Sequence, residues 1–289
     1  MRVSRFLAGT VAAATAVAAA ATATATAVTT AGRAPPARVI PAARLLPAPP
    51  PARFVALGDS YTAGAEGGDE GRPQGGCVRS ADAYPALWAR RHAPASFVSA
   101  ACAGATTSGV ARQQLSALSA GTTLVAVTVG GNDAGFSRVL QTCVTELWNS
   151  GCLHAVASAE AFITQALPGR LDTTLRAIRA RAPSARIVVL GYPDLYDLSR
   201  SAGCIGMATA KRTVLDQGAD LLDRALSAAA ARNGDVFADV RPGFAGHEIC
   251  DPGGWLHSVT FPFANSYHPT AQGQDRGYLP AFTAAAGGG

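Results

Sequence analysis

The chain has 289 residues, of which 48% are hydrophobic and 15% charged, and a formal net charge of +5. The excess positive charge belongs to the first 52 residues, which hold five of the 24 basic residues and none of the 19 acidic ones. The remainder, residues 53–289, is therefore neutral and long enough for one α/β domain with a large core. This balance removes the electrostatic support for a nucleic-acid partner.

The N-terminus has the pattern of a secretory signal peptide. Arg2 and Arg5 form a short positive region, and an Ala/Thr/Val run completes residues 1–31. A membrane anchor is the alternative, but the run is poor in Leu and Ile, so we expect no stable anchor. Residues 32–52 are dense in Pro, Ala and Arg and are interpreted as a propeptide or linker. One working domain (53–289) follows, and the protein is predicted to be secreted and extracellular.

Six cysteines lie in the working domain and none precedes it. An even number behind a signal peptide predicts three disulfides formed in an oxidising compartment. The sequence alone leaves fifteen pairings open among Cys77, Cys102, Cys143, Cys152, Cys204 and Cys250. Cys-x-x-Cys and His-x-x-x-His spacings are both absent, so we expect no zinc site.

Five apolar, β-branched runs alternate with stretches of helical periodicity. The predicted strands are Phe54–Leu57, Ser96–Ala100, Thr123–Val129, Arg186–Leu190 and Val236–Val240. The predicted helices are Ala83–His92, Val110–Leu118, Phe136–Trp148, Ala155–Arg181 with a break near Pro168, and Ala208–Arg232. This alternation predicts a parallel sheet with helices on both faces. If the first and third strands are central neighbours, the strand order is 2-1-3-4-5 and the site lies at their carboxyl ends.

The first predicted strand runs directly into Gly58-Asp59-Ser60. Four apolar residues followed by this tripeptide indicate a buried strand that ends in an abrupt turn. A serine presented on such a turn is a candidate nucleophile. The alternative is that the tripeptide is only a polar turn or the N-cap of the next helix.

Three further elements fit an acyl-transfer site. Gly104 follows the second strand, where a glycine lets a backbone N–H approach a substrate oxygen without a Cβ in the way. Asn132 follows the third strand in a Gly-Gly-Asn-Asp turn, and its amide can donate to an oxyanion. His268 lies near the C-terminus before Pro269, which restricts the local backbone. Each element is weak alone, but together they indicate a serine hydrolase.

In this order the elements resemble the SGNH hydrolases, also called the GDSL lipases and esterases. The four motif blocks are matched by Gly58-Asp59-Ser60, Gly104, Gly130-Gly131-Asn132-Asp133 and Tyr267-His268-Pro269. The resemblance runs from Phe54 to about Gly273 and looks closest to secreted bacterial members with three sequential disulfides. It implies a flavodoxin-like three-layer α/β/α sandwich with a five-stranded parallel sheet. It also implies the pairs Cys77–Cys102, Cys143–Cys152 and Cys204–Cys250.

The resemblance assigns roles within a carboxylic ester hydrolase. Ser60 is the expected nucleophile and His268 the general base. The expected oxyanion hole consists of the backbone N–H groups of Ser60 and Gly104 and the side chain of Asn132. The substrate is a small-molecule or lipid ester, and no metal or organic cofactor is required. Nothing in the chain suggests more than a monomer.

One position departs from the family pattern. The family usually has Asp three residues before the catalytic His, where this chain has Asn265. We favour the interpretation that the main-chain carbonyl of Asn265 accepts a hydrogen bond from Nδ1–H of His268. The alternative is that a carboxylate reaches the imidazole, with Asp251 or Asp59 as the nearest candidates.

Substrate class is open at this level. An acetylesterase acting on O-acetylated polysaccharide is the alternative enzyme, and a non-catalytic secreted binding protein is a third interpretation. The glycine-rich stretch 64–76 is either a wall of the site or a plain surface loop. The segment Gly243–Tyr267 contains Trp255, Phe261 and Phe263, which either contact an acyl chain or cover the core. The Ala/Gly tail from Ala284 is expected to fray.

Overall fold

The computed structural model describes residues 51–68, 77–200, 204 and 206–287. The predicted signal peptide (1–31), nearly all of the predicted linker and most of the glycine-rich stretch lie outside these ranges. Within them, no helix is both long and apolar enough to cross a membrane.

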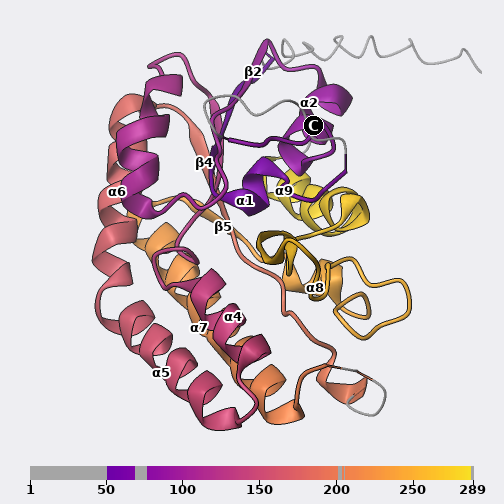
Figure 1. Ribbon diagram of the computed structural model, residues 1–289. Coiled ribbons are helices and arrows are strands. Elements are labelled where there is room, and N and C mark those ends of the chain that lie inside the picture. Colours follow the sequence, from indigo (N-terminus) through magenta and orange to yellow (C-terminus); the bar gives the residue numbers. More distant parts are fainter. Residues whose placement is uncertain (1–50, 69–76, 201–203, 205, 288–289) are drawn as a thin grey trace, which may run out of the picture. The chain divides into compact units, whose positions relative to one another are not determined.

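The domain is built on one five-stranded parallel sheet (Figure 1). Its order is β2-β1-β3-β4-β5, as the sequence predicts. The strands are β1 (Arg53–Gly58), β2 (Ser96–Ser99), β3 (Leu124–Thr128), β4 (Arg186–Leu190) and β5 (Val236–Ala238). Strand β1 lies between β2 and β3, and its Val55 is in register with Val98 of β2 and Val125 of β3. The carboxyl ends of β1 and β3 therefore lie side by side, which places the loops that follow them at one edge of the sheet.

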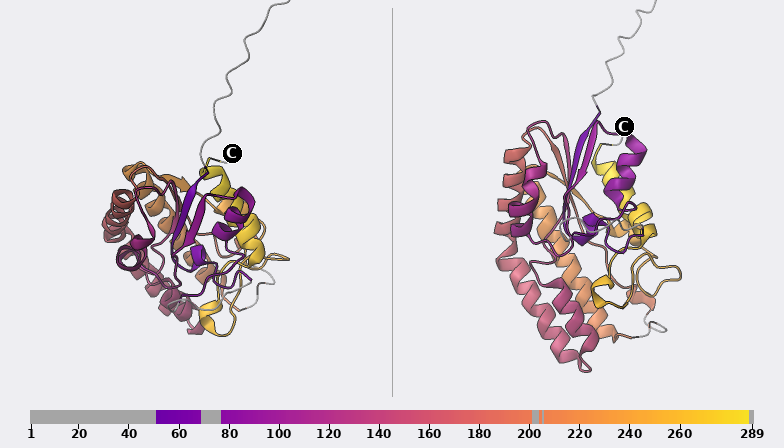
Figure 2. Two further views of the ribbon diagram at one scale, coloured as in Figure 1. Left: turned by 90° about the horizontal axis from the view of Figure 1, so that it is seen from above. Right: turned by 45° about the horizontal axis from the view of Figure 1, so that its top comes forward.

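Helices cover both faces of this sheet, and the three-layer α/β/α fold is confirmed (Figures 1 and 2). One layer contains the long helices α4 (Phe136–Thr145), α5 (Asn149–Gln165), α6 (Leu167–Arg181) and α7 (Thr209–Asn233). The other contains α2 (Tyr84–His92) and α9 (Leu279–Ala285), which pack against each other. Short helices α1 (Ser60–Ala63), α3 (Thr107–Gly109) and α8 (Arg241–Phe244) lie in connections. Phe54 of β1 packs against Trp88, Phe97 and Phe282, so the N-terminal strand and C-terminal helix share the core.

The predicted helix Val110–Leu118 is wrong in type. The chain instead forms α3, a π-helical turn (Val110–Gln114) and a 3₁₀ turn (Leu115–Ala117). Buried Gln114 exchanges two hydrogen bonds with the backbone of Gly58, at 2.7 and 2.9 Å. The widened turn places this amide against β1, a tertiary contact that helical periodicity does not reveal.

Other element bounds also need correction. Helix α4 ends at Thr145, and α5 starts at Asn149 rather than at Ala155. The break between α5 and α6 falls at Ala166, where Pro168 occupies the first turn of the next helix. The sequence reading missed α9 and expected fraying from Ala284, which is part of α9. Burial of Phe282 against the sheet stabilises this helix despite its weak composition.

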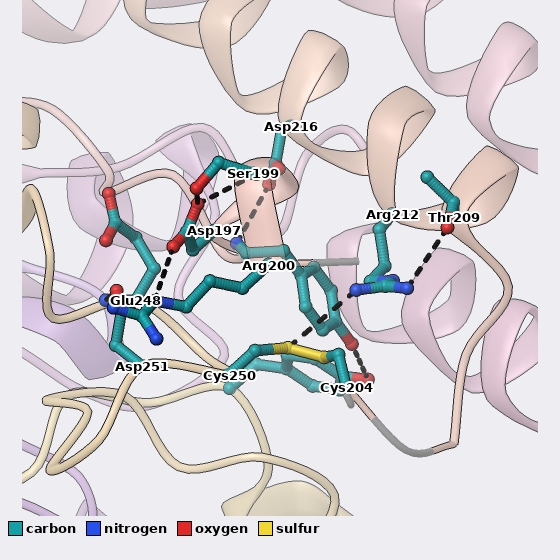
Figure 3. Close-up of a disulfide and its surroundings, with 12 residues drawn as sticks. Asp197, Ser199, Arg200, Cys204, Thr209, Arg212, Asp216, Glu248, Cys250 and Asp251 are labelled. Carbon is teal, nitrogen blue, oxygen red and sulfur yellow. Dashed lines mark hydrogen bonds and ion pairs between the residues drawn. A yellow bond between two sulfur atoms is a disulfide. The ribbon is translucent and has the colours of Figure 1, made fainter. Parts of the chain in front are cut away.

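The three disulfides have the pairing that the resemblance implies: Cys77–Cys102, Cys143–Cys152 and Cys204–Cys250. No cysteine is free among the described residues. The first bridge is attached to the loop after β2, the second closes the turn between α4 and α5, and the third joins two connecting segments (Figure 3).

Candidate active site

Ser60 lies on a sharp strand-to-helix turn. Gly58 ends β1 with φ of 120°, and a Cβ at this position would come within 2.2 Å of the Thr128 carbonyl oxygen, so only glycine fits. Asp59 caps α1 by accepting a hydrogen bond from the Tyr61 backbone N–H at 3.0 Å. The tripeptide is therefore both a helix N-cap and a turn that presents a serine. Asp59 caps α1, and Ser60 follows it at the carboxyl end of β1.

Three hydrogen-bond donors belong to residues that line one groove with the Ser60 hydroxyl. The backbone N–H groups of Ser60 and Gly104 donate to no acceptor within the described part of the chain. Gly104 has φ of 78°, and a Cβ there would meet open space. Its backbone conformation, rather than crowding, therefore favours glycine. The Asn132 side chain donates one hydrogen bond to the Ala105 carbonyl at 3.2 Å, which leaves its second amide hydrogen for another acceptor.

Two buried side chains join the loops that carry these donors. Asp133 accepts from the backbone N–H of Thr107 at 2.8 Å and from its hydroxyl at 2.6 Å, which links the loop after β3 to the loop after β2. Tyr192, in the segment after β4, donates to Asp59 at 2.5 Å and accepts from the backbone N–H of Gly131 at 3.1 Å. The positions of the three donors are thus fixed by side-chain hydrogen bonds between loops.

His268 reaches the serine from the C-terminal segment. Its Nε2 lies 2.8 Å from Ser60 Oγ, within hydrogen-bonding distance. The preceding residue, Tyr267, is fully buried with φ of 65°, and its carbonyl accepts from the Tyr61 hydroxyl at 2.7 Å. His257 pairs through the main chain with Tyr267 and His268, at 2.9 Å in each bond. The imidazole is therefore positioned by the backbone of a segment far from Ser60 in sequence.

The electrostatic surroundings keep His268 neutral. Burial, with a smaller contribution from His257, lowers its pKa to about 4, against the opposing effect of the Asn265 backbone, which favours the protonated ring. Nδ1 is buried and has no hydrogen-bond partner among the described residues.

The two carboxylates considered as partners of His268 have other partners. Asp251 forms an ion pair with Arg200 at 2.8 Å and accepts from the Glu248 backbone at 3.1 Å, close to the Cys204–Cys250 disulfide (Figure 3). Asp59 bonds to Tyr61 and Tyr192, as described above. Burial raises the pKa of Asp59 to about 7, despite the hydrogen bond from Tyr192.

Ser60 and His268 open into a groove of about 580 Å³. Gly104 and Asn132 line this groove. Arg138 and Gln141 from α4 also line it, as does Phe263 from the segment that precedes His268. The three aromatic residues of the Gly243–Tyr267 segment have separate positions. Phe263 lines the groove, Trp255 packs into the core against Phe244, and Phe261 is 88% exposed. No group of three or more His, Cys, Asp or Glu among the described residues is arranged to hold a metal ion.

Comparisons with known proteins agree with this geometry. Residues 56–276 match the GDSL-like Lipase/Acylhydrolase family, and the chain therefore belongs to that family of carboxylic ester hydrolases. It is 47% identical to Lipase 1 of Streptomyces coelicolor over 81% of this chain and 86% of the relative. The crystal structure of phospholipase A1 from Streptomyces albidoflavus is 46% identical to this chain, with a TM-score of 0.79 that covers 82% of this chain and 100% of that one. The crystal structure of an extracellular lipase from Streptomyces rimosus is also 46% identical, with a TM-score of 0.78 and coverage of 81% and 99% respectively.

The structure brings Ser60, Gly104, Asn132 and His268 together in one groove. Sequence reasoning missed the residues that hold them in place, namely Gln114, Asp133, Tyr192 and Tyr61. Only Asp133 carried a signal, because it belongs to the Gly-Gly-Asn-Asp turn. The other three contact partners that lie 56 to 206 residues away along the chain, and no local sequence pattern reveals such contacts.

Proposed function

We propose that this protein is a secreted lipid acyl-ester hydrolase that works through an acyl-enzyme on Ser60. The observation that carries the proposal is the 2.8 Å contact between Ser60 Oγ and His268 Nε2, in a groove that also contains three donors with spare hydrogen-bonding capacity. Nucleophile, base and oxyanion donors are the parts that acyl transfer needs.

In the proposed reaction, Ser60 Oγ attacks the ester carbonyl while neutral His268 takes its proton. The oxyanion accepts hydrogen bonds from the Ser60 and Gly104 N–H groups and from Asn132 Nδ2. His268 then gives the proton to the leaving alcohol, and the acyl group remains on Ser60. Water, deprotonated by the same imidazole, releases the acid and restores the free serine.

We further propose that the Asn265 carbonyl orients His268 in place of a carboxylate. The Asn265 backbone is the one influence that raises the pKa of His268 against burial, as an acceptor beside the ring would. The acceptor belongs to the main chain, so the amide side chain at this position is not required. Asp251 and Asp59 are engaged elsewhere, which supports this choice over a carboxylate partner.

The walls of the groove favour lipid esters. Phe263 supplies apolar surface on one side, and the Arg138 guanidinium on the other has no ion-pair partner in the described ranges. This pairing suits an acyl chain beside a polar or phosphate-bearing headgroup. The names of the relatives, lipases and a phospholipase A1, point the same way. No observation specifically favours acetylated polysaccharide.

Secretion is supported by three disulfides and by a relative described as extracellular. The predicted signal peptide supports it as well, and the monomeric state stays a prediction. Mass spectrometry of the mature protein from culture medium would test the cleavage expected near residue 31. An intact N-terminus retained in the cell would contradict secretion.

The direct test of function is hydrolysis of p-nitrophenyl esters from acetyl to palmitoyl by the wild type and by Ser60→Ala. We expect turnover by the wild type, with a preference for longer acyl chains, and none by the variant. Covalent labelling of Ser60 by a serine-directed phosphonate is the matched readout. A folded wild type that neither hydrolyses these esters nor takes up the phosphonate would contradict the proposal.

A further inference from the structure

The turn between α4 and α5 exposes two large apolar side chains to water. Leu147 is 92% exposed and Trp148 77%. Single exposed apolar residues are ordinary on protein surfaces, but two adjacent large ones on a projecting turn are a recognised mark of an interaction site. Neither packs into the core described above.

This turn is held in a defined conformation. The Cys143–Cys152 disulfide closes it across the ends of the two helices. The buried Lys211 ammonium, from α7, donates to the main-chain carbonyls of Cys143 at 3.0 Å and Glu146 at 2.5 Å. A fixed backbone reduces the entropy that the two side chains lose when they are buried in a partner.

The exposed turn is continuous with the catalytic groove. Arg138 and Gln141 of α4 line the groove, and Thr145 follows at the spacing that keeps residues on one helix face. All three are exposed. Helix α4 ends at Thr145, about 6 Å beyond Gln141, and Trp148 follows three residues later. A partner bound at the turn would therefore lie next to the mouth of the groove.

We propose that Leu147 and Trp148 anchor the enzyme to the surface of a lipid aggregate, so that the groove faces its ester substrate. This inference rests on the proposed lipid-ester function. Trp favours the boundary between water and acyl chains because its ring is apolar and its indole N–H is polar. A second copy of the chain fits poorly, since a stable protein interface buries about 800 Å² on each partner and two side chains supply much less.

Vesicle binding tests the anchor without catalysis. The Ser60→Ala variant is mixed with sonicated phosphatidylcholine vesicles, and its tryptophan emission is recorded. The chain has three tryptophans, and the other two, Trp88 and Trp255, are buried, so a change reports on Trp148. We expect a shift to shorter wavelength and quenching by brominated acyl chains. Emission that does not respond to vesicles at any lipid concentration would overturn the proposal.

Variants separate anchoring from chemistry. Trp148→Ser and Leu147→Ser, made in the Ser60→Ala background, should each weaken co-sedimentation with vesicles at least about tenfold, whereas Trp148→Phe should retain most of it. Val98→Thr is the matched control, because Val98 is 46% exposed on the edge strand β2, distant from this turn (Figures 1 and 2). With Ser60 intact, Trp148→Ser should keep wild-type kcat/KM on dissolved p-nitrophenyl butyrate and lose rate only on vesicles.

Three results with these variants would also overturn the anchor. The first is equal vesicle binding by Trp148→Ser and its parent. The second is equal loss of binding in the Val98→Thr control. The third is a dimer in size-exclusion chromatography that Trp148→Ser converts to a monomer. Binding by an enzyme that hydrolyses no ester would instead contradict the proposed function and leave the anchor standing.

Discussion

The two sides of the catalytic groove are held together by different means. The oxyanion side, formed by the loops after β1, β2 and β3, is joined by side-chain hydrogen bonds from Asp133 and Tyr192. The base side, residues 256–269, is held by main-chain pairing around His268 and by the Tyr61 hydroxyl. The carboxylates thus support the donors, while backbone geometry and burial position the base.

Under the proposed mechanism, this difference accounts for a site that lacks the aspartate usual three residues before the histidine. A carboxylate beside His268 would favour the imidazolium and raise its pKa. Burial instead lowers the pKa to about 4, so the imidazole is neutral and able to accept a proton across a wide pH range. The cost is less stabilisation of the imidazolium in the transition state, which the oxyanion donors must offset.

Loss of the base should have the largest effect. His268→Ala is expected to lower kcat by about 10⁴ or more, comparable with Ser60→Ala, because the two groups act as one unit. The double variant should be no worse than either single variant. Steady-state kinetics on p-nitrophenyl butyrate measures this. Additive losses in the double variant would show that the two residues act independently.

Loss of one oxyanion donor should come next. Asn132→Ala is expected to lower kcat by about 10²–10³, with a smaller change in KM, because the donor acts mainly in the transition state. Gln141→Ala is the control, since Gln141 lines the same groove but forms no hydrogen bond with Ser60 or His268 within the described part of the chain. Equal losses in kcat for both variants would mean that Asn132 only shapes the groove.

Loss of a carboxylate on the oxyanion side should cost less. Asp133→Ala removes the acceptor of both Thr107 hydrogen bonds and should lower kcat by about ten- to a hundred-fold through displacement of the loops. Asp251→Ala removes another buried acceptor and should lower the melting temperature while kcat stays near the wild type. If Asp251→Ala abolishes activity in folded protein, a carboxylate does serve the base side.

The pH dependence of kcat/KM should follow His268. Protonation of the imidazole removes the base, so activity is lost as the pH falls through its pKa of about 4 and is retained at pH 5 to 6. Because burial also raises the pKa of Asp59 to about 7, the profile should be repeated with Asp59→Asn. A fall in kcat/KM centred near pH 6.5 in both proteins would show that the pKa of His268 is not lowered by burial.

The fold, and the residues that meet in the groove, were accessible from sequence for definite reasons. The apolar strands have strong periodicity, and Ser60, Gly104, Asn132 and His268 belong to short motifs whose order is diagnostic. The features that were not predicted from sequence depend on tertiary contacts. Gln114 widens a helix to reach Gly58, and α9 is stable because Phe282 is buried in the core. Local propensity carries neither contact.

Asn265→Ala tests most directly whether the main chain at this position orients His268. This substitution keeps the carbonyl and removes only the side chain. With p-nitrophenyl butyrate, we expect kcat within about threefold of the wild type, beside a loss of about 10⁴ or more for His268→Ala. A loss in Asn265→Ala that approaches that of His268→Ala, in protein with an unchanged melting temperature, would show that the side chain, and not the main chain, orients the base.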